Sequence, residues 1–258
     1  MELGLEDRVA VVTGASRGIG LAIVRALAFR GATVVAGARR SSAELDELAA
    51  GKVDIVLVDL TEPFGPAGLV EAAGDRIDVL VNNVGGAPVR TGGFLEVTDD
   101  QWATSIALNL LVAVRTTRSA LARMLPARRG AIVNVCSVNA ELPDPAVIDY
   151  GAAKAALLNF SKALSKEVGP YGIRVNTVSP GPVSTDLWMG DAGVAATVAR
   201  ATGATPEEVV DRTVGDIVTG RFSQPDEIAD VVVLLASDRA ANVTGTDVRV
   251  DGGLVPTW

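Results

Sequence analysis

The sequence predicts an α/β protein built on one doubly wound parallel sheet, and two observations carry that prediction. Short runs rich in β-branched residues alternate with longer stretches rich in alanine and leucine, from Val9 to Val250. Most of the short runs are continuously apolar, as in parallel strands whose two faces are both covered by helices. No linker, charge run or internal repeat interrupts the alternation over the 258 residues, so we expect a single domain.

Seven strands are expected, because seven short apolar runs end at glycine, polar or charged residues. In chain order they are Arg8–Thr13, Thr33–Ala38, Val53–Asp59, Val79–Asn82, Ala131–Cys136, Arg174–Val178 and Asp247–Val250. Six helices are expected between them, because these longer stretches are rich in good helix formers. They are Gly18–Arg30, Ala43–Ala50, Pro66–Gly74, Asp99–Met124, Tyr150–Gly169 and Pro225–Ala236.

The stretch 186–216 departs from this alternation. It follows the sixth strand and mixes four glycines with amphipathic pieces such as Pro206–Arg212, for which Thr205 is a suitable N-cap. Long excursions after the carboxyl end of a strand commonly form active-site lids in such folds. We therefore expect a substrate lid; the alternative is a surface insertion without function. Trp188 within it is expected either to contact substrate or to stabilise the lid.

The composition excludes several kinds of chemistry. The chain has no histidine, which removes Ser-His-Asp and Cys-His catalysis and histidine-ligated metals. Its single cysteine excludes an intramolecular disulfide and a cysteine-rich metal site. Acid–base chemistry must therefore use tyrosine, lysine, aspartate or glutamate, and we expect no metal.

The charge and hydropathy patterns limit the partners. A net charge of −8 argues against general binding to nucleic acid or to anionic membranes, which needs a basic surface. The first residues are acidic where a secretion signal would be basic, and no apolar run approaches the roughly 18 residues of a membrane span. We therefore expect a cytoplasmic protein without nucleic-acid or membrane partners.

A glycine-rich motif, Thr13–Gly20, follows the first predicted strand and opens the first predicted helix. Glycines allow a sharp turn close to a phosphate, and the helix N-terminus offers free N–H groups and a positive dipole end. The motif predicts a dinucleotide site, although its spacing is G-x-x-x-G-x-G rather than G-x-G-x-x-G; the alternative is a simple tight turn. The residues expected to bind the cofactor are Gly14, Ser16, Arg17, Gly18, Ile19 and Gly20.

The end of the second predicted strand indicates which dinucleotide binds. An acidic residue there usually binds the free ribose hydroxyls of NAD, whereas arginine suits the 2′-phosphate of NADP. This chain has Ala38 followed by Arg39 and Arg40, and Arg17 lies in the glycine motif. We therefore expect NADP(H); the alternative is that the three arginines are solvated surface charges.

A second motif, Tyr150-x-x-x-Lys154, opens a predicted helix. Positions i and i+4 share one helix face, and a lysine ammonium near a phenol favours the phenolate and lowers its pKa. Tyr150 is then a usable proton donor and acceptor in a protein without histidine. Ser137, thirteen residues upstream at the end of a predicted strand, is expected to place a hydroxyl in the same crevice.

In these motifs and their order, the chain resembles the classical short-chain dehydrogenase/reductase family from roughly Val9 to Gly253. The matching pieces are Thr13–Gly20, Asp59–Thr61, Asn82–Gly85, Asn109, Ser137, Tyr150 with Lys154, and Ser179–Thr185. Val84 stands where the family usually has alanine, and Cys136 where it often has serine; neither departure removes a reacting group. The resemblance implies a Rossmann-like fold and an NADP(H)-dependent ketoreductase, reversible as an alcohol dehydrogenase.

The resemblance also implies residue roles. Tyr150 would be the general acid in reduction and the base in oxidation, and Lys154 would lower its pKa and hold the nicotinamide ribose. Ser137 would bind the substrate oxygen, and Asn109 would hold a water that links Lys154 to solvent. Further cofactor contacts would come from Asp59, Leu60, Asn83, Gly85, Pro180, Gly181, Val183 and Thr185.

The substrate and the assembly are less constrained. The substrate is either a 3-oxoacyl group on a carrier protein or a free ketone, sugar or secondary-metabolite carbonyl; the negative charge counts against the first. Arg128 and Arg129 form either a landing point for an acidic carrier or a solvated loop pair.

The non-enzyme alternative is a dinucleotide-binding regulatory protein, which a complete catalytic set disfavours. The resemblance implies a homotetramer through helices Asp99–Met124 and Tyr150–Gly169.

Overall fold

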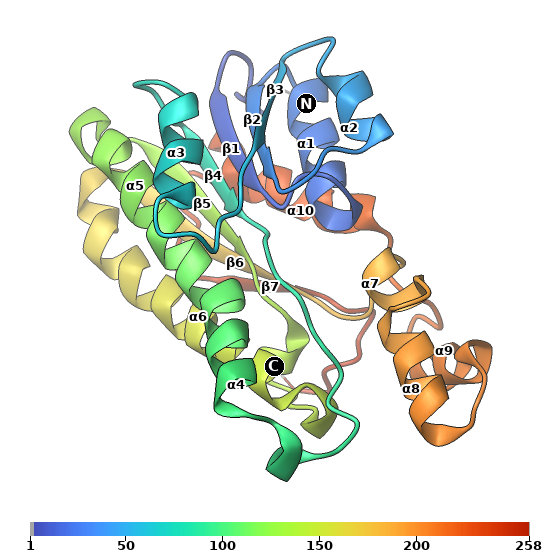
Figure 1. Cartoon of the computed structure of the whole chain (residues 1–258). Coiled ribbons are helices and arrows are strands. Elements are labelled where there is room, and N and C mark those ends of the chain that lie inside the picture. Colours follow the sequence, from blue (N-terminus) through green and yellow to red (C-terminus); the bar gives the residue numbers. More distant parts are fainter. Residues whose placement is uncertain (1–2, 258) are drawn as a thin grey trace.

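The computed structural model describes residues 3–257, which form one parallel sheet of seven strands between two layers of helices (Figure 1). The strand order is β3-β2-β1-β4-β5-β6-β7. The strands are β1 Val9–Thr13, β2 Thr33–Ala38, β3 Val53–Leu57, β4 Val79–Asn82, β5 Gly130–Val135, β6 Ile173–Pro180 and β7 Asp247–Val250. The order reverses between β1 and β4, where ligands bind in doubly wound sheets. The predicted fold class is confirmed.

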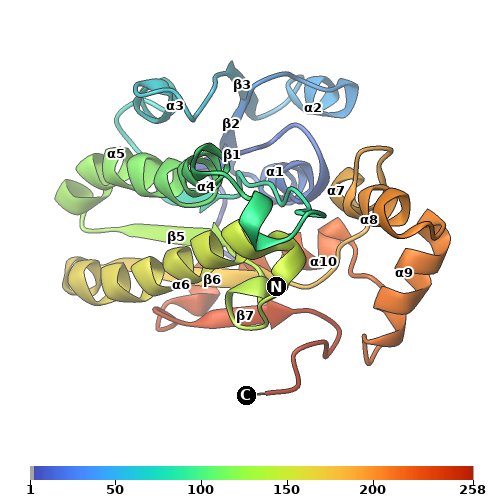
Figure 2. The ribbon, with the colours of Figure 1, turned by 60° about the horizontal axis from the view of Figure 1, so that its bottom comes forward.

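Consecutive strand residues point to opposite faces and supply two apolar cores. In β1 the fully buried Val12 and Val11 belong to different cores. The core of Val12 lies under α1 Gly18–Phe29, α2 Ala43–Leu48 and α10 Pro225–Ala236, and that of Val11 under α3 Gly65–Ala72, α5 Val112–Ala127 and α6 Ile148–Val168 (Figure 2). Burial on both faces explains why the strands are continuously apolar in the sequence.

The predicted helix Asp99–Met124 is interrupted. It consists of α4 (Asp99–Ile106), a π-helical turn over Ala107–Leu111 and then α5. A π-turn accommodates one extra residue in the helix and often marks a functional site. The other predicted strand and helix boundaries lie within two residues of the observed ones.

The predicted lid contains three short helices rather than an irregular loop. They are α7 Asp186–Met189, α8 Val194–Thr202 and α9 Pro206–Gly215, and they project from the body of the protein beyond β6 (Figure 1). Thr205 caps α9 as expected, because its side chain accepts the N–H of Glu208 while the Glu208 carboxylate accepts the N–H of Thr205. Trp188 packs edge-on against Phe222 with ring centroids 5.1 Å apart, so it stabilises the lid's attachment.

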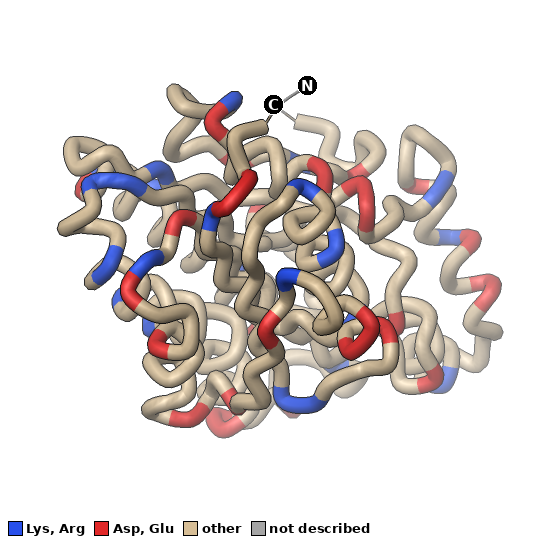
Figure 3. The backbone as a smooth tube through the Cα atoms, turned by 90° about the horizontal axis from the view of Figure 1, so that it is seen from above, with Lys and Arg blue, Asp and Glu red and all other residues tan. Residues whose placement is uncertain are grey.

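Within residues 3–257, no helix is both long and apolar enough to cross a membrane. Basic and acidic residues alternate along the backbone drawn in Figure 3 rather than gathering by sign.

Candidate active site

One cleft of about 2010 Å³ runs from the glycine motif to the lid. It is lined by every residue predicted to bind cofactor or to react, with the exception of Asn109, which lies buried behind the wall. Residues from the ends of six strands, β1 to β6, and from the lid thus meet in one place, although they are far apart in the sequence. The convergence agrees with a site at the carboxyl ends of the strands.

The glycine motif forms a cradle that only glycine can build. A Cβ on Gly20 would lie 2.1 Å from the carbonyl oxygen of Gly14 and 2.5 Å from Nδ2 of Asn83. Gly14 and Gly18 have φ of +67° and +54°, a region that favours glycine. Nδ2 of Asn83 donates to the carbonyl oxygens of Thr13 and Gly14, both at 3.1 Å, and thereby holds the loop.

The start of α1 is prepared for an anionic group. No side chain caps this helix and no acidic residue lies in its first turn, so its first N–H groups face the cleft without an intramolecular acceptor from a side chain. Free N–H groups and the positive end of the helix dipole suit a pyrophosphate. The cradle and the helix start therefore fit a dinucleotide.

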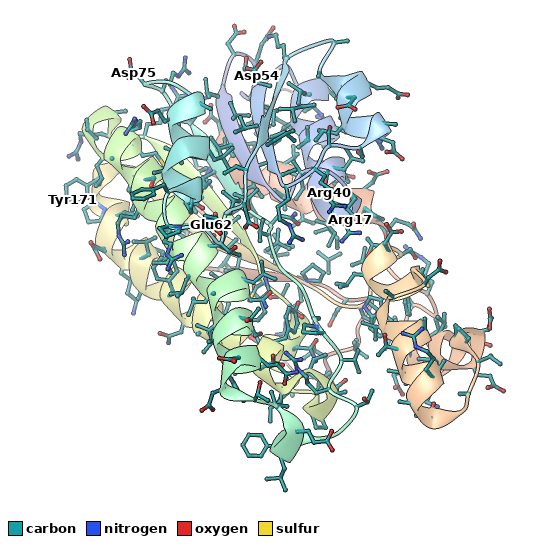
Figure 4. All side chains as sticks on the ribbon, viewed as in Figure 1. Arg17, Arg40, Asp54, Glu62, Asp75 and Tyr171 are labelled. Atoms are coloured by element: carbon teal, nitrogen blue, oxygen red, sulfur yellow. The ribbon has the colours of Figure 1, made fainter. Side chains whose placement is uncertain are left out.

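Three arginines stand around the far end of this cradle. Ala38 ends β2 with 5% of its surface exposed, and the exposed Arg39 and Arg40 follow it. Figure 4 shows Arg17 and Arg40 close together near α7. The Arg17 guanidinium lies 3.8 Å from the carboxylate of Asp186, with both side chains largely exposed. The cluster offers positive charge where a 2′-phosphate would lie.

Asp59 lies next to this corner, in the loop after β3. Its carboxylate accepts hydrogen bonds from the hydroxyl and the N–H of Thr61, at 2.7 and 2.9 Å. These bonds, with a smaller contribution from the charge of Arg39, hold the pKa of the Asp59 carboxyl below its ordinary value. The carboxylate is therefore ionised in the cleft, and the adenine contact expected for it stays a prediction.

The hydroxyls of Ser137 and Tyr150 lie at the other end of the cleft. Ser137 follows β5; its Oγ accepts the N–H of Asn139 at 3.2 Å and donates to the Asn139 side-chain oxygen at 3.3 Å. Lys154 is 3% exposed, donates to the carbonyl oxygen of Val135 at 2.8 Å, and has its Nζ 5.8 Å from the ring centre of Tyr150. Burial lowers the pKa of the Lys154 ammonium.

The Tyr150 phenol does not have the lowered pKa expected from the sequence. Burial raises the pKa of Tyr150 to about 12, and a hydrogen bond with Ser137 offsets only part of this effect. Since Nζ of Lys154 points to a backbone carbonyl and lies over the ring face, desolvation of the phenol is the larger influence. Tyr150 is consequently neutral near pH 7, the form that can donate a proton.

Asn109 lies within the π-helical turn and is 1% exposed. Its side chain accepts the N–H of Gly86 at 3.0 Å and donates to the carbonyl oxygen of Gly86 at 3.0 Å. The same amide donates to the carbonyl oxygen of Ser105 at 3.1 Å. The Asn109 side chain thus fixes the position of the backbone at Gly86, just beyond β4. The role of holding a water, which the resemblance implies for Asn109, stays a prediction.

The remaining predicted contacts lie at the end of β6. Pro180, Gly181, Val183 and Thr185 line the cleft, and Val183 pairs with Ser223 in an isolated bridge. A Cβ on Gly18 would lie 3.2 Å from the methyl of Thr185, so this segment touches the glycine motif. The segment therefore closes the cleft between cofactor cradle and lid.

The contacts bear on two further residues or pairs singled out in the sequence. Cys136 is buried and donates to the carbonyl oxygen of Lys154 at 3.2 Å, and burial raises the pKa of its thiol, as suits a structural residue. Arg128 donates to the carbonyl oxygen of Pro170 at 2.9 Å and lies over the ring of Tyr171, while Arg129 is 3.7 Å from the carboxylate of Asp78. The arginine pair therefore has local partners.

Three polar contacts of the site were not predicted from the sequence: Asn139 with Ser137, Gly86 with Asn109, and the ion pair of Arg90 with Asp149 beside Tyr150. Arg90 and Asp149 are separated by 59 residues, so no local spacing could reveal their contact.

Comparisons with known proteins agree with this geometry. A family model of short-chain dehydrogenase/reductases, described as enoyl-(acyl carrier protein) reductase, matches residues 14–255. The 3-oxoacyl-[acyl-carrier-protein] reductase of Vibrio harveyi is 34% identical over 98% of this chain and 99% of its own length. A putative ketoacyl reductase of the monensin polyketide synthase from Streptomyces virginiae is 38% identical over 96% of this chain and 97% of its own.

Two solved structures share the fold, each with a TM-score of 0.88. One is a putative NAD(P)-dependent gluconate 5-dehydrogenase from Beutenbergia cavernae with bound NADP, 33% identical and covering 100% of both chains. The other is a variant of actinorhodin polyketide ketoreductase with NADPH, 34% identical over 96% of this chain and 97% of that one. The chain therefore belongs to the short-chain dehydrogenase/reductase family of NAD(P)(H)-dependent oxidoreductases, which interconvert carbonyl and alcohol groups.

Proposed function

We propose that this NADP(H)-dependent oxidoreductase is a ketoreductase whose substrates carry the carbonyl on an apolar acyl or ring framework. The observation that carries the proposal is the pair of hydroxyls, Ser137 and Tyr150, at the end of a cleft that begins at the glycine cradle. The cradle and Arg17, Arg39 and Arg40 would hold NADPH, which supplies a hydride to the carbonyl carbon when bound.

The residues of this chain would handle the oxygen. Ser137 donates a hydrogen bond to the carbonyl oxygen, which stabilises the negative charge that develops there. Tyr150, neutral near pH 7, gives its phenolic proton to the same oxygen. Lys154 supplies a buried positive charge beside Tyr150 and would bind the ribose of the nicotinamide half. In the oxidation direction, Tyr150 must first lose its proton to act as a base.

The cleft wall around these hydroxyls favours an apolar substrate. From the body come Val138, Leu142 and Val147, and from the lid come Leu187, Trp188, Val194, Val198 and Val209. The same cleft also has polar side chains, among them Asn139, Arg212 and Asp216, so a hydroxyl of the substrate that meets the apolar residues instead would lose its partners at a cost. The two curated relatives named above, both ketoacyl reductases, support the same substrate class.

A panel of carbonyl compounds tests the proposal by the loss of NADPH absorbance. We expect turnover of the N-acetylcysteamine thioester of acetoacetate and of a bicyclic ketone such as 1-decalone. We expect little turnover of 5-ketogluconate, a polyol, or of crotonyl thioester, which needs a proton at carbon instead of oxygen. Preference for either of the last two would contradict the proposed substrate class.

The role of Tyr150 is tested with Tyr150→Phe, which keeps the ring and removes the proton donor. We expect turnover to fall by at least about 10²-fold, with NADPH binding little changed. Tyr171→Phe is the matched control: Tyr171 is 45% exposed and lies far from the cleft (Figure 4), so turnover should be unchanged. Near-normal turnover of Tyr150→Phe would remove Tyr150 from the mechanism.

The substrate can be either free or bound to a carrier protein, and we propose that it is free. Arg128 and Arg129 already have local partners, and the net charge is −8. A carrier protein loaded with the acetoacetyl group should therefore show a kcat/KM no higher than the free thioester.

We also propose a homotetramer formed through α5 and α6. Of the apolar residues in α5, in α6 and in the π-helical turn before α5, Val112, Leu157 and Leu164 are buried in the protein's own core. Others keep exposed surface and remain available to a second copy: Leu110, Leu111, Val114, Leu158 and Phe160. Light scattering should report four chains, and a monomer at micromolar concentration would refute the proposal.

A cytoplasmic location stays a prediction, which fractionation of expressing cells tests.

A further inference from the structure

Residues 85–98 belong to the long connection from β4 to α4 (Figure 1), and Gly85, Gly86, Ala87 and Val89 of this segment line the cleft. The segment is attached at two places. At its start, the side chain of Asn109 binds both backbone groups of Gly86. Further along, Arg90 ties it to the start of α6, the helix that carries Tyr150.

The second attachment consists of three hydrogen bonds. The N–H of Arg90 donates to the carbonyl oxygen of Ala146 at 2.7 Å. Its guanidinium donates through Nε and Nη2 to the two carboxylate oxygens of Asp149, at 3.3 and 2.5 Å. The side chain of Arg90 is 12% exposed and that of Asp149 is 0% exposed, so water competes little for this pair.

Asp149 also lies in the first turn of α6, directly before Tyr150. Helix α6 has no side-chain cap at Val147, and its free N–H groups need acceptors. The backbone N–H groups of Asp149 and Tyr150 lie close enough to the Asp149 carboxylate to favour its charged form. Burial alone would raise the pKa of Asp149, but the hydrogen bonds and charge of Arg90, with these N–H groups, hold it below its ordinary value.

We infer that Arg90 and Asp149 are positioning residues for the proton transfer: together they hold the first turn of α6 so that the Tyr150 phenol lies beside Ser137. Neither residue is placed against the substrate oxygen; they act through Tyr150. The inference rests on the proton-donor role proposed above for Tyr150. A displacement on the order of 1 Å in a reacting group can lower a rate by about a hundredfold, so the attachment matters for turnover.

A purely structural role is the competing explanation. Breaking a buried ion pair destabilises a protein because the remaining charge stays buried without a partner. Asp78 offers a matched case within this chain: its side chain is 5% exposed, it pairs with Arg76 at 2.8 Å and Arg8 at 3.4 Å, and it accepts the N–H of Val9. It lies before β4, at the sheet edge opposite the cleft.

The experiment compares Asp149→Asn with Asp78→Asn, using the acetoacetyl thioester as probe at a temperature where circular dichroism shows both variants folded. We expect both to melt at lower temperature. Only Asp149→Asn should lose kcat, by about tenfold to a hundredfold, with the dissociation constant for NADPH unchanged. Equal kcat values in the two variants would show that the Arg90–Asp149 pair serves stability alone.

Two further variants keep the test decisive. If Asp149→Asn does not fold, Arg90→Lys retains the charge but loses the two-pronged geometry, and it should still lower kcat without weakening NADPH binding. In a Tyr150→Phe background, Asp149→Asn should have little further effect, because the pair acts through Tyr150. An undiminished further loss would overturn the inference, whereas normal turnover of Tyr150→Phe alone would overturn the proposed mechanism instead.

Discussion

The substitution Ala38→Asp should shift cofactor preference from NADPH towards NADH. Ala38 is 5% exposed at the end of β2 and lines the same cleft as the glycine cradle and Arg17, Arg39 and Arg40. Its methyl group leaves room for a 2′-phosphate. A carboxylate here would repel that phosphate and would accept hydrogen bonds from the free ribose hydroxyls of NADH.

The magnitude follows from the surroundings. Two unit charges about 5 Å apart repel by about 3 kcal/mol at an effective dielectric constant near 20. Arg39 and Arg40 are exposed and the cleft is open to solvent, so screening reduces this to about 2 kcal/mol. A new hydrogen bond to NADH contributes about 1 kcal/mol after desolvation. Together, about 3 kcal/mol corresponds to a change of about 150-fold in the ratio of kcat/KM values.

The assay is kcat/KM for NADPH and NADH at one salt concentration, supported by dissociation constants from nucleotide fluorescence. Ala38→Asn is the matched control, since it adds nearly the same volume without charge and should change the ratio much less. Arg39→Ala should weaken NADPH alone, by about fivefold, because an exposed arginine contributes about 1 kcal/mol.

A wild-type enzyme that favours NADH would show that the arginine cluster does not bind the 2′-phosphate. An Ala38→Asp variant with an unchanged ratio, or with the same ratio as Ala38→Asn, would show that the phosphate lies elsewhere.

Three further predictions test other parts of the structure. Gly20→Ala should lower the melting temperature by about 2–10 °C and weaken NADPH binding, because the new Cβ would lie 2.1 Å from the carbonyl oxygen of Gly14. Gly68→Ala is the control: a Cβ at Gly68 has open space around it, so the melting temperature and NADPH binding should not change. Alcohol oxidation should accelerate from about pH 7 to pH 10 while carbonyl reduction stays flat, because the Tyr150 pKa of about 12 keeps the acid form dominant; a flat oxidation profile would contradict this. Amide hydrogen exchange should be faster across the lid, residues 186–216, than across β5, and equal protection would indicate a rigid insertion.

The sequence by itself determined the parts of this protein that depend on local order. The central strands could be predicted because they are buried on both faces and therefore read as continuous apolar runs, as in Val9–Thr13. The edge strands β3 and β7 are less buried and include charged residues. The glycine cradle could be predicted because its constraint is local: Gly14, Gly18 and Gly20 lie within seven residues and shape one turn. The arginines around Ala38 could be placed because the parallel strands bring β1 and β2 to one edge.

Tertiary structure alone decided the features that depend on packing between distant segments. The π-turn around Asn109 cannot be read from sequence, since a helical pattern does not show where one extra residue is accommodated. The Tyr150 pKa depends on the desolvation imposed by every element around the phenol, which outweighs the single neighbour at i+4. Arg90 and Asp149 meet only because the fold brings the β4–α4 segment against α6, and a buried charge is tolerated only where such a partner arrives.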